Sequence, residues 1–95
     1  MEDVLWYLFA SSRGAPTRVE IMEALLERPQ NANQLAEALG YDYTTIRHHL
    51  DVLKENNVIR STERGYGDVY LLTDIAKHHR DDLEMVLDAV EGESR

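Results

Sequence analysis

Apolar residues recur at helical spacing along most of the chain, and they gather in short β-rich runs near its middle. The first amphipathic stretch covers about residues 2–10 and stops at the breaker cluster of residues 11–14. A second helix is predicted after residues 17–20, Thr-Arg-Val-Glu, because this tetrapeptide has the form of a capping box. Pro29 ends this helix, since proline cannot continue its hydrogen-bond ladder.

A closely spaced pair of helices is predicted next. The first covers residues 33–39 and is closed by Gly40, a candidate C-cap. Asp42 is a good N-cap for the second, which runs from residue 43 to about 56. Two helices joined by so short a turn cross at a steep angle. The second helix has an apolar side of Ile46, Leu50 and Leu53 and an opposite, polar side of Thr44, His48 and Asp51.

A hairpin and a last helix complete the pattern. Two β-rich runs, residues 58–61 and 68–72, flank a segment whose glycines, Gly65 and Gly67, supply the turn. Thr73 then caps a final helix over residues 74–90, in which apolar side chains follow the 3-4-3-4 spacing of a coiled-coil seam. The seam positions are Ala76, His79, Leu83, Val86 and Val90.

The 95 residues form a single domain, and their formal net charge of −8 is unevenly distributed. Residues 43–66 carry four basic and three acidic side chains, a balance of +1, so the rest of the chain carries −9. A surface this acidic suits a salt-saturated cytoplasm, and we expect a halophilic source, an archaeon or one of its viruses.

Cysteine and long apolar runs are both missing from the sequence. Without cysteine there are no disulfides, thiolate metal sites or thiol redox sensors. Without a run of about 18 apolar residues or a basic N-terminal start, we expect no spanning helix and no secretory signal. The predicted protein is cytoplasmic and has no membrane partner.

The segment NANQLAEALGYDYTTIRHHLDVLKENNVIRS resembles the DNA-binding core of ArsR-like regulators, which read as an LA…L helix, a turn, and T-[VI]-x-x-H-L-x-x-L before the wing. The matching positions are Leu35-Ala36, Leu39, Thr45-Ile46, His49-Leu50, Leu53 and Asn57-Val58-Ile59, and Tyr70 to Thr73 match the second wing strand. The resemblance covers residues 17–74. It implies a winged helix-turn-helix fold, mainly α with a small β-hairpin wing over residues 58–72.

The resemblance also implies that the helix from Tyr43 is the recognition helix of a transcriptional regulator, with a repressor as the default for short members of this family. Arg47 would read guanine O6 and N7, while Lys54 would touch only phosphate. In the wing, Arg64 beside Gly65 is best placed to reach the DNA backbone or minor groove. The candidate DNA-binding residues are Tyr43, Thr44, Thr45, Arg47, His48, Lys54, Arg60, Arg64 and Tyr66.

Simpler structural roles compete with these assignments. Arg47 also fits an i,i+4 ion pair with Asp51, which is worth a few tenths of a kcal/mol. Thr45 suits packing or capping in the first helical turn as well as DNA contact. His49 lies at the edge of the buried stripe, where packing is the favoured role.

The terminal helices carry more large apolar residues than a three-helix core needs, and in the resembling family these helices form a two-fold interface. We therefore expect a homodimer through helices 2–10 and 74–90, bound to a pseudo-palindromic operator. A buried His79 would make this dimer pH-dependent. The expected interface residues are Leu5, Trp6, Phe9, His79, Leu83, Val86, Leu87 and Val90.

Other functions have weaker support in the sequence. Asp74, His78 and Asp82 share a helix face, but such ladders are common and the family's cysteine-bearing metal motif is absent, so we expect no metal and no cofactor. Catalysis is not expected from so small a domain without a pocket. The alternative function is a winged helix that docks onto a protein of the transcription or replication machinery.

Overall fold

A computed structural model of the chain describes residues 1–62 and 67–93 and shows a mainly helical fold with a small antiparallel sheet. This confirms the predicted fold class. The elements in chain order are α1 (Glu2–Trp6), the π-helix η1 (Tyr7–Ser11), α2 (Ala15–Glu27), β1 (Gln30–Asn31), α3 (Ala32–Leu39), α4 (Tyr43–Glu55), β2 (Ile59–Ser61), β3 (Val69–Leu72), α5 (Asp74–His78) and α6 (Arg80–Glu93).

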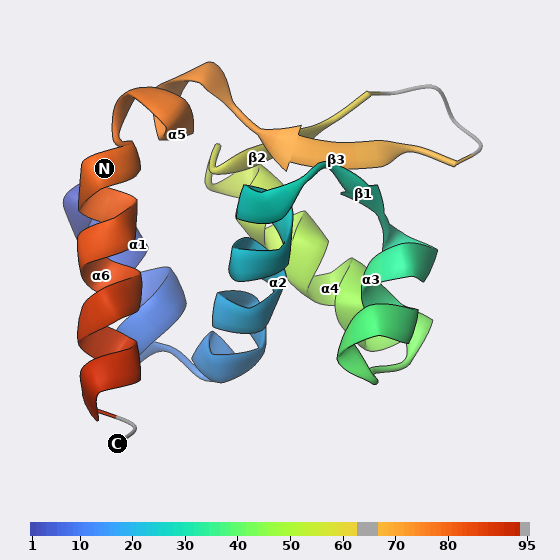
Figure 1. Ribbon diagram of the computed structural model, residues 1–95, viewed down its shortest axis with the longest axis horizontal. Helices are drawn as coiled ribbons and strands as arrows, with labels where there is room; N and C mark the ends of the chain where they lie inside the picture. Colours follow the sequence, from blue (N-terminus) through green and yellow to red (C-terminus); the bar gives the residue numbers. More distant parts are fainter. Residues whose placement is uncertain (63–66, 94–95) are drawn as a thin grey trace.

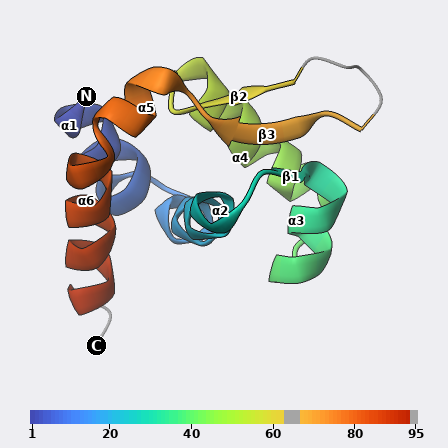
Figure 2. The ribbon, with the colours of Figure 1, turned by 45° about the horizontal axis from the view of Figure 1, so that its top comes forward.

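Helix α2 lies at the centre of the molecule (Figures 1 and 2). The terminal helices α1, η1 and α6 pack side by side at one end, and α3 and α4 form the other end. The sheet extends along one side of the molecule and connects through α5 to α6. No helix in the described part of the chain is long and apolar enough to cross a membrane.

One continuous apolar core joins the two ends of the molecule. It buries the apolar side of α4 as predicted, together with apolar residues of α1, η1, α2 and α6. Each fully buried leucine-sized side chain contributes about 1.5–3 kcal/mol relative to an exposed one. The largest fully buried side chains are Leu5, Leu8, Phe9, Ile21, Met22, Leu35, Ile46, Leu50, Leu53, Val58, Ile59 and Leu83.

The hairpin is confirmed, and a third strand joins it. β2 and β3 pair antiparallel with Ile59 opposite Leu72, and β1 pairs with the other edge of β3, where Gln30 lies opposite Tyr70. A strand of two residues has no alternation of its own, so the sequence pattern does not reveal it. The predicted turn glycine Gly65 lies outside the described residues.

Helix α2 begins earlier than its predicted cap. Gly14, at φ +84°, occupies the N-cap position, and Pro16 lies in the first turn, where its missing N–H costs nothing. The predicted capping box of Thr17 and Glu20 is wrong, because both residues lie inside the helix. A capping box exists instead at α3, where the Asn31 side chain accepts from the Gln34 backbone N–H at 2.8 Å.

The final helix is divided at His79, so one continuous seam over residues 74–90 is wrong. The predicted cap is confirmed: Thr73 Oγ1 accepts from the Ala76 backbone N–H at 3.1 Å. After α5 the backbone of His79 leaves helical geometry, and α6 starts anew. Leu83 and Val86 then face the core of their own chain.

Candidate nucleic-acid interface

The helix-turn-helix is built by two local signals that the sequence contains. Gly40 ends α3 in the left-handed conformation, at φ +76°, which glycine adopts without steric cost. Asp42 begins α4, and its Oδ1 accepts from the Thr45 backbone N–H at 2.7 Å. This hydrogen bond lowers the pKa of the Asp42 carboxyl. Both predicted caps are confirmed, and they fix the direction in which α4 leaves the turn.

The two sides of α4 differ sharply. Its apolar side is fully buried, and His49 beside it is only 7% exposed, which confirms the predicted packing role of this histidine. Its outer side begins with Tyr43, which is 46% exposed, and continues with Thr44, His48 and Asp51. Thr45 is half-buried and donates its backbone N–H to the cap. The outer side therefore presents hydroxyl, imidazole and carboxylate groups.

Arg47 lies along this outer side and is held by weak contacts. Its Nη2 is 3.8 Å from Asp51 Oδ1, and its Nη1 donates to the Tyr43 hydroxyl at 3.2 Å. The hydrogen bond to Tyr43 raises the pKa of Arg47. The ion pair expected from the sequence is present, but half-exposed pairs of this kind are worth only a few tenths of a kcal/mol. A stronger acceptor can therefore displace these contacts.

A small cleft of about 80 Å³ separates α4 from the base of the wing. Two buried polar atoms on its lining residues, Arg47 Nε and Asp68 Oδ1, have no hydrogen-bond partner. Burial raises the pKa of Tyr70, which also lines the cleft. Asp68 and Tyr70 were not among the predicted site residues, because they are distant from Arg47 in the sequence and only the folded chain places them beside it. The lining residues are Asn31, Ala32, Asn33, Tyr43, Arg47, Gly67, Asp68 and Tyr70.

The wing residues are only partly described. Arg60 is exposed on β2, opposite Leu71 of β3. Lys54 is exposed, and its Nζ lies 3.5 Å from Ser61 Oγ, so it spans the end of α4 and β2. Arg64 and Tyr66, both predicted to contact DNA, lie outside the described residues.

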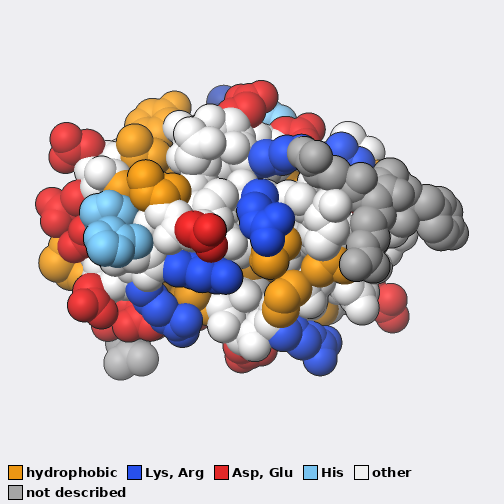
Figure 3. Space-filling model, turned by 90° about the horizontal axis from the view of Figure 1, so that it is seen from above, with side chains coloured by type: hydrophobic (Ala, Val, Ile, Leu, Met, Phe, Trp, Pro, Cys, Tyr) orange, Lys and Arg blue, Asp and Glu red, His pale blue; other side chains and the backbone are white. Residues whose placement is uncertain are grey.

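Lys and Arg side chains gather across the middle of the face that is seen from above (Figure 3). A shallow groove of about 280 Å³ combines apolar residues of α2 and β3 with the cations Arg28, Lys77 and Arg80. Arg80 Nε is 2.9 Å from Glu84 Oε1, so one of these cations is already paired. Three cations therefore lie at one groove of a chain that is acidic overall.

Several known proteins share this architecture. Residues 15–61, from the start of α2 to the end of β2, match the family model described as bacterial regulatory protein, arsR family. The transcriptional repressor BigR from Xylella fastidiosa is 19% identical, with a TM-score of 0.67 over 88% of this chain and 74% of that one. The fold is a winged helix-turn-helix.

Two further solved structures have the same winged helix-turn-helix arrangement. M. tuberculosis Rv0081 is 20% identical, with a TM-score of 0.68 over 99% of this chain and 93% of that one. The PcaV transcriptional regulator from Streptomyces coelicolor, solved with its natural ligand, is 18% identical, with a TM-score of 0.67 over 93% of this chain and 65% of that one. A comparison with curated proteins found no match. These neighbours share the fold of this chain, and the family model matches residues 15–61.

The residues predicted to form a dimer interface have different environments in this winged helix-turn-helix. Leu5, Phe9, Leu83, Val86 and Leu87 are buried in the core of the chain itself. They are therefore not surplus apolar surface, which was the reason for assigning them to the interface.

The other three assigned residues, Trp6, His79 and Val90, are half-buried. His79 Nδ1 lies 3.3 Å from Asp82 Oδ2. Two large apolar side chains are exposed on η1 and α6, Tyr7 at 59% and Met85 at 45%, and Met85 was not among the residues from which we predicted the dimer. Among residues 1–62 and 67–93, no three imidazole or carboxylate groups are placed to hold a metal ion.

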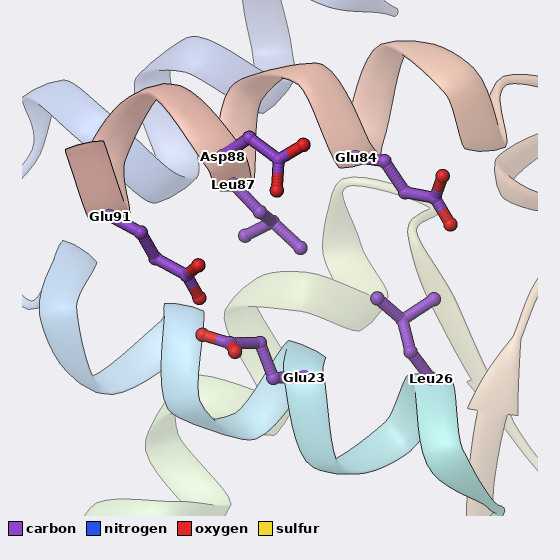
Figure 4. A pocket seen from close by; sticks show the side chains of 6 residues that line it. All are labelled: Glu23, Leu26, Glu84, Leu87, Asp88 and Glu91. Atoms are coloured by element: carbon purple, nitrogen blue, oxygen red, sulfur yellow. The ribbon is translucent and has the colours of Figure 1, made fainter.

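An acidic groove of about 260 Å³ lies between α2 and α6 (Figure 4). The carboxyl groups of Glu23 and Glu91 point toward each other across it. Burial, a hydrogen bond to Glu91 and the nearby charges of Glu91, Glu20 and Asp88 raise the pKa of Glu23 to about 7. A carboxyl group of α2 whose pKa is raised to about 7 therefore faces a carboxyl group of α6.

Proposed function

We propose that this protein is a sequence-specific, double-stranded DNA-binding regulator that acts as a homodimer in the cytoplasm, with repression as its default effect. The observation that carries the proposal is the contrast between the two sides of α4: the apolar side is fully buried, and the outer side presents hydrogen-bonding groups from its first turn. Small hydroxyl residues at the start of the helix allow close approach to the major groove, and Arg47 supplies a fork for guanine.

A protein-docking role is the alternative, and the surface of α4 favours DNA over it. A docking helix carries exposed aliphatic residues that become buried against the partner. On α4 the outer aliphatic residue, Val52, is half-buried, and the exposed large side chain is Tyr43, whose hydroxyl already accepts from Arg47.

Exposed apolar side chains on the terminal helices support the dimer. Tyr7 and Met85 are exposed, and Trp6 and Val90 are half-buried on the same pair of packed segments, α1–η1 and α6. A two-fold axis at this surface would cover these residues and present two α4 helices to one face of DNA, about one helical turn apart. The expected operator is then a pseudo-palindrome.

The test is a selection from random duplex DNA in high-potassium buffer, with the native protein, Arg47→Ala and Arg80→Ala. Arg80 is a matched control, since its side chain is also about half-exposed and has an i,i+4 carboxylate partner, and it lies on α6. We expect the native protein and Arg80→Ala to enrich an inverted repeat, and Arg47→Ala to lose about 1–3 kcal/mol of discrimination at a guanine. A folded native protein that enriches no sequence at any salt concentration would move the function to protein docking.

A further inference from the structure

One arginine is buried at the centre of the molecule and connects three of its segments. Arg18 of α2 is 3% exposed. Its Nε donates to the Leu8 carbonyl at 2.8 Å, and its Nη2 donates to Ser12 Oγ and, at 3.0 Å, to the Arg13 carbonyl. Its Nη1 lies 3.2 Å from Nδ1 of His49, on the buried side of α4. A single guanidinium thus joins the end of η1 to the recognition helix.

This cation has no carboxylate partner among the described residues, because their ion pairs do not include Arg18. Burial lowers the pKa of Arg18, while Tyr7 of η1 raises it. Arginine remains protonated under such a shift, so its five N–H groups act as donors only. The carbonyls, the Ser12 hydroxyl and the His49 ring are the acceptors that satisfy it.

The contact defines the protonation state of His49. Nδ1 must accept from Arg18, so the ring is neutral and its proton lies on Nε2. Burial first, and then the charges of Arg18 and the neighbouring His48, lower the pKa of His49. His48 is the second group that acts on this ring, at 5.2 Å between ring centroids.

The turn between η1 and α2 is shaped to admit this ring. A Cβ added at Gly14 would lie 2.6 Å from Cε1 of His49 and 3.1 Å from Nη1 of Arg18. Gly14 also has φ +84°, which side-chain-bearing residues rarely adopt. Two features therefore require glycine at position 14: the positive φ of its backbone, and the His49 ring, which leaves no room for a Cβ.

We propose that Arg18 is a positioning residue that holds recognition helix α4 against the end of η1 through the neutral ring of His49, and that it thereby couples the terminal helices to DNA reading. The coupling rests on the proposed function, whereas the link itself is a property of the fold. Protonation of His49 would place two cations in contact in a buried site and remove the acceptor, so the link opens.

The direction of the pH effect follows from the lowered pKa of His49. Its neutral form is favoured in the folded protein, so the stabilisation is complete above the usual imidazole pKa of 6.5 and is lost as pH falls through the lowered value. Acid has the opposite effect on stability at Glu23, which faces Glu91. Its protonation relieves the repulsion between the two carboxyl groups and stabilises the fold. If α4 and η1 both become less stable as the pH falls, the protonation of His49 is therefore the cause.

The test compares hydrogen-exchange protection of the α4 and η1 amides between pH 7.5 and pH 5 in the native protein, His49→Asn and the control His48→Asn. Asparagine places an acceptor Oδ1 where the imidazole has Nδ1, but it does not titrate. We expect native and His48→Asn protection to fall together in both segments, by up to about tenfold per pH unit between the usual imidazole pKa of 6.5 and the lowered pKa of His49. We expect His49→Asn to keep its protection. A native protein without this fall, or a His49→Asn variant that loses protection equally, would overturn the link.

Arg18→Lys decides the case if His49→Asn does not fold, because one ammonium cannot reach Leu8, Ser12 and His49 at once. We expect this variant to have reduced η1 protection at pH 7.5 and no further fall with acid, and native-like protection would contradict the proposal. Binding of each variant to the enriched duplex is then measured across the same pH range. Loss of affinity in step with protection supports the coupling, and pH-independent affinity with changing protection refutes it. If the native protein enriches no duplex, the proposed function fails while the exchange result still decides the link.

Discussion

The two ends of the molecule differ in how completely their apolar side chains are buried within the chain. At the α3–α4 end the apolar side of α4 is buried and both helix starts are capped, by Asn31 and Asp42. At the α1–α6 end Tyr7 and Met85 remain exposed. One end is thus complete in a single chain and offers polar groups to a polar partner, whereas the other end has apolar surface that a second copy would cover. This difference supports our proposal that the α3–α4 end reads DNA and that the α1–α6 end forms the dimer.

The largest expected effect is a loss of stability at Gly14, which lies against the Arg18–His49 contact between the two ends. Gly14→Ala should lower the free energy of unfolding by about 3 kcal/mol, because backbone strain and a clash with His49 add together. Gly40→Ala is the matched control: φ is +76° there, but a Cβ would meet nothing within 4 Å, and we expect a loss of about 1 kcal/mol. Urea unfolding measures both losses. Equal losses would show that the close approach of His49 contributes nothing.

The next effect separates assembly from folding. Met85→Glu should weaken dimerisation by about 1–2 kcal/mol, because a charge would be buried at the proposed interface, and should change monomer stability by less than about 0.5 kcal/mol. Ile75→Glu, at another exposed apolar position but on α5, should leave the dimer unchanged. Sedimentation equilibrium measures both variants. A native protein that is monomeric at micromolar concentration would remove the assembling role from this end.

The smallest effect concerns the carboxyl pair between α2 and α6. The pKa of Glu23 is raised from 4.5 to about 7, so its stabilising contribution is complete below 4.5 and is lost as pH rises through about 7. Because Glu23 is exposed, screening reduces this contribution to about 0.5–1 kcal/mol. Glu23→Gln should abolish the fall in unfolding free energy as the pH rises through about 7. Glu27→Gln, on the same helix, should retain this fall. Urea unfolding between pH 4 and 8 checks this, and identical profiles for all three proteins would contradict it.

Salt should act on the same pair and on the acidic surface as a whole. Molar KCl screens repulsion among carboxylates, so the melting temperature should be higher there than in low salt. Equal melting temperatures in both buffers would contradict the halophilic origin that we propose from the composition.

The α3–α4 end could be predicted from the sequence because its signals are local. Gly40 and Asp42 act within four residues of their own helices, and Ile46, Leu50 and Leu53 show their burial through spacing alone. The buried role of His49 followed in the same way. These features need no knowledge of distant segments.

The terminal end could not be predicted equally well, because distant contacts decide it. Arg18 received no role from the sequence, because its partner His49 lies 31 residues away. Leu83 and Val86 of α6 pack into the core of their own chain, and the spacing alone could not distinguish that core from a partner helix. β1 exists only through its pairing with β3.

The most direct test of DNA reading by α4 is a map of backbone amide shifts when a 20-base-pair duplex of random sequence is added to the labelled protein. We expect the largest shifts at Tyr43 to His48 and in the wing strands, with α1 and α6 unchanged. Shifts confined to the terminal helices, or no shifts at all from a folded protein, would contradict the assignment of the recognition helix.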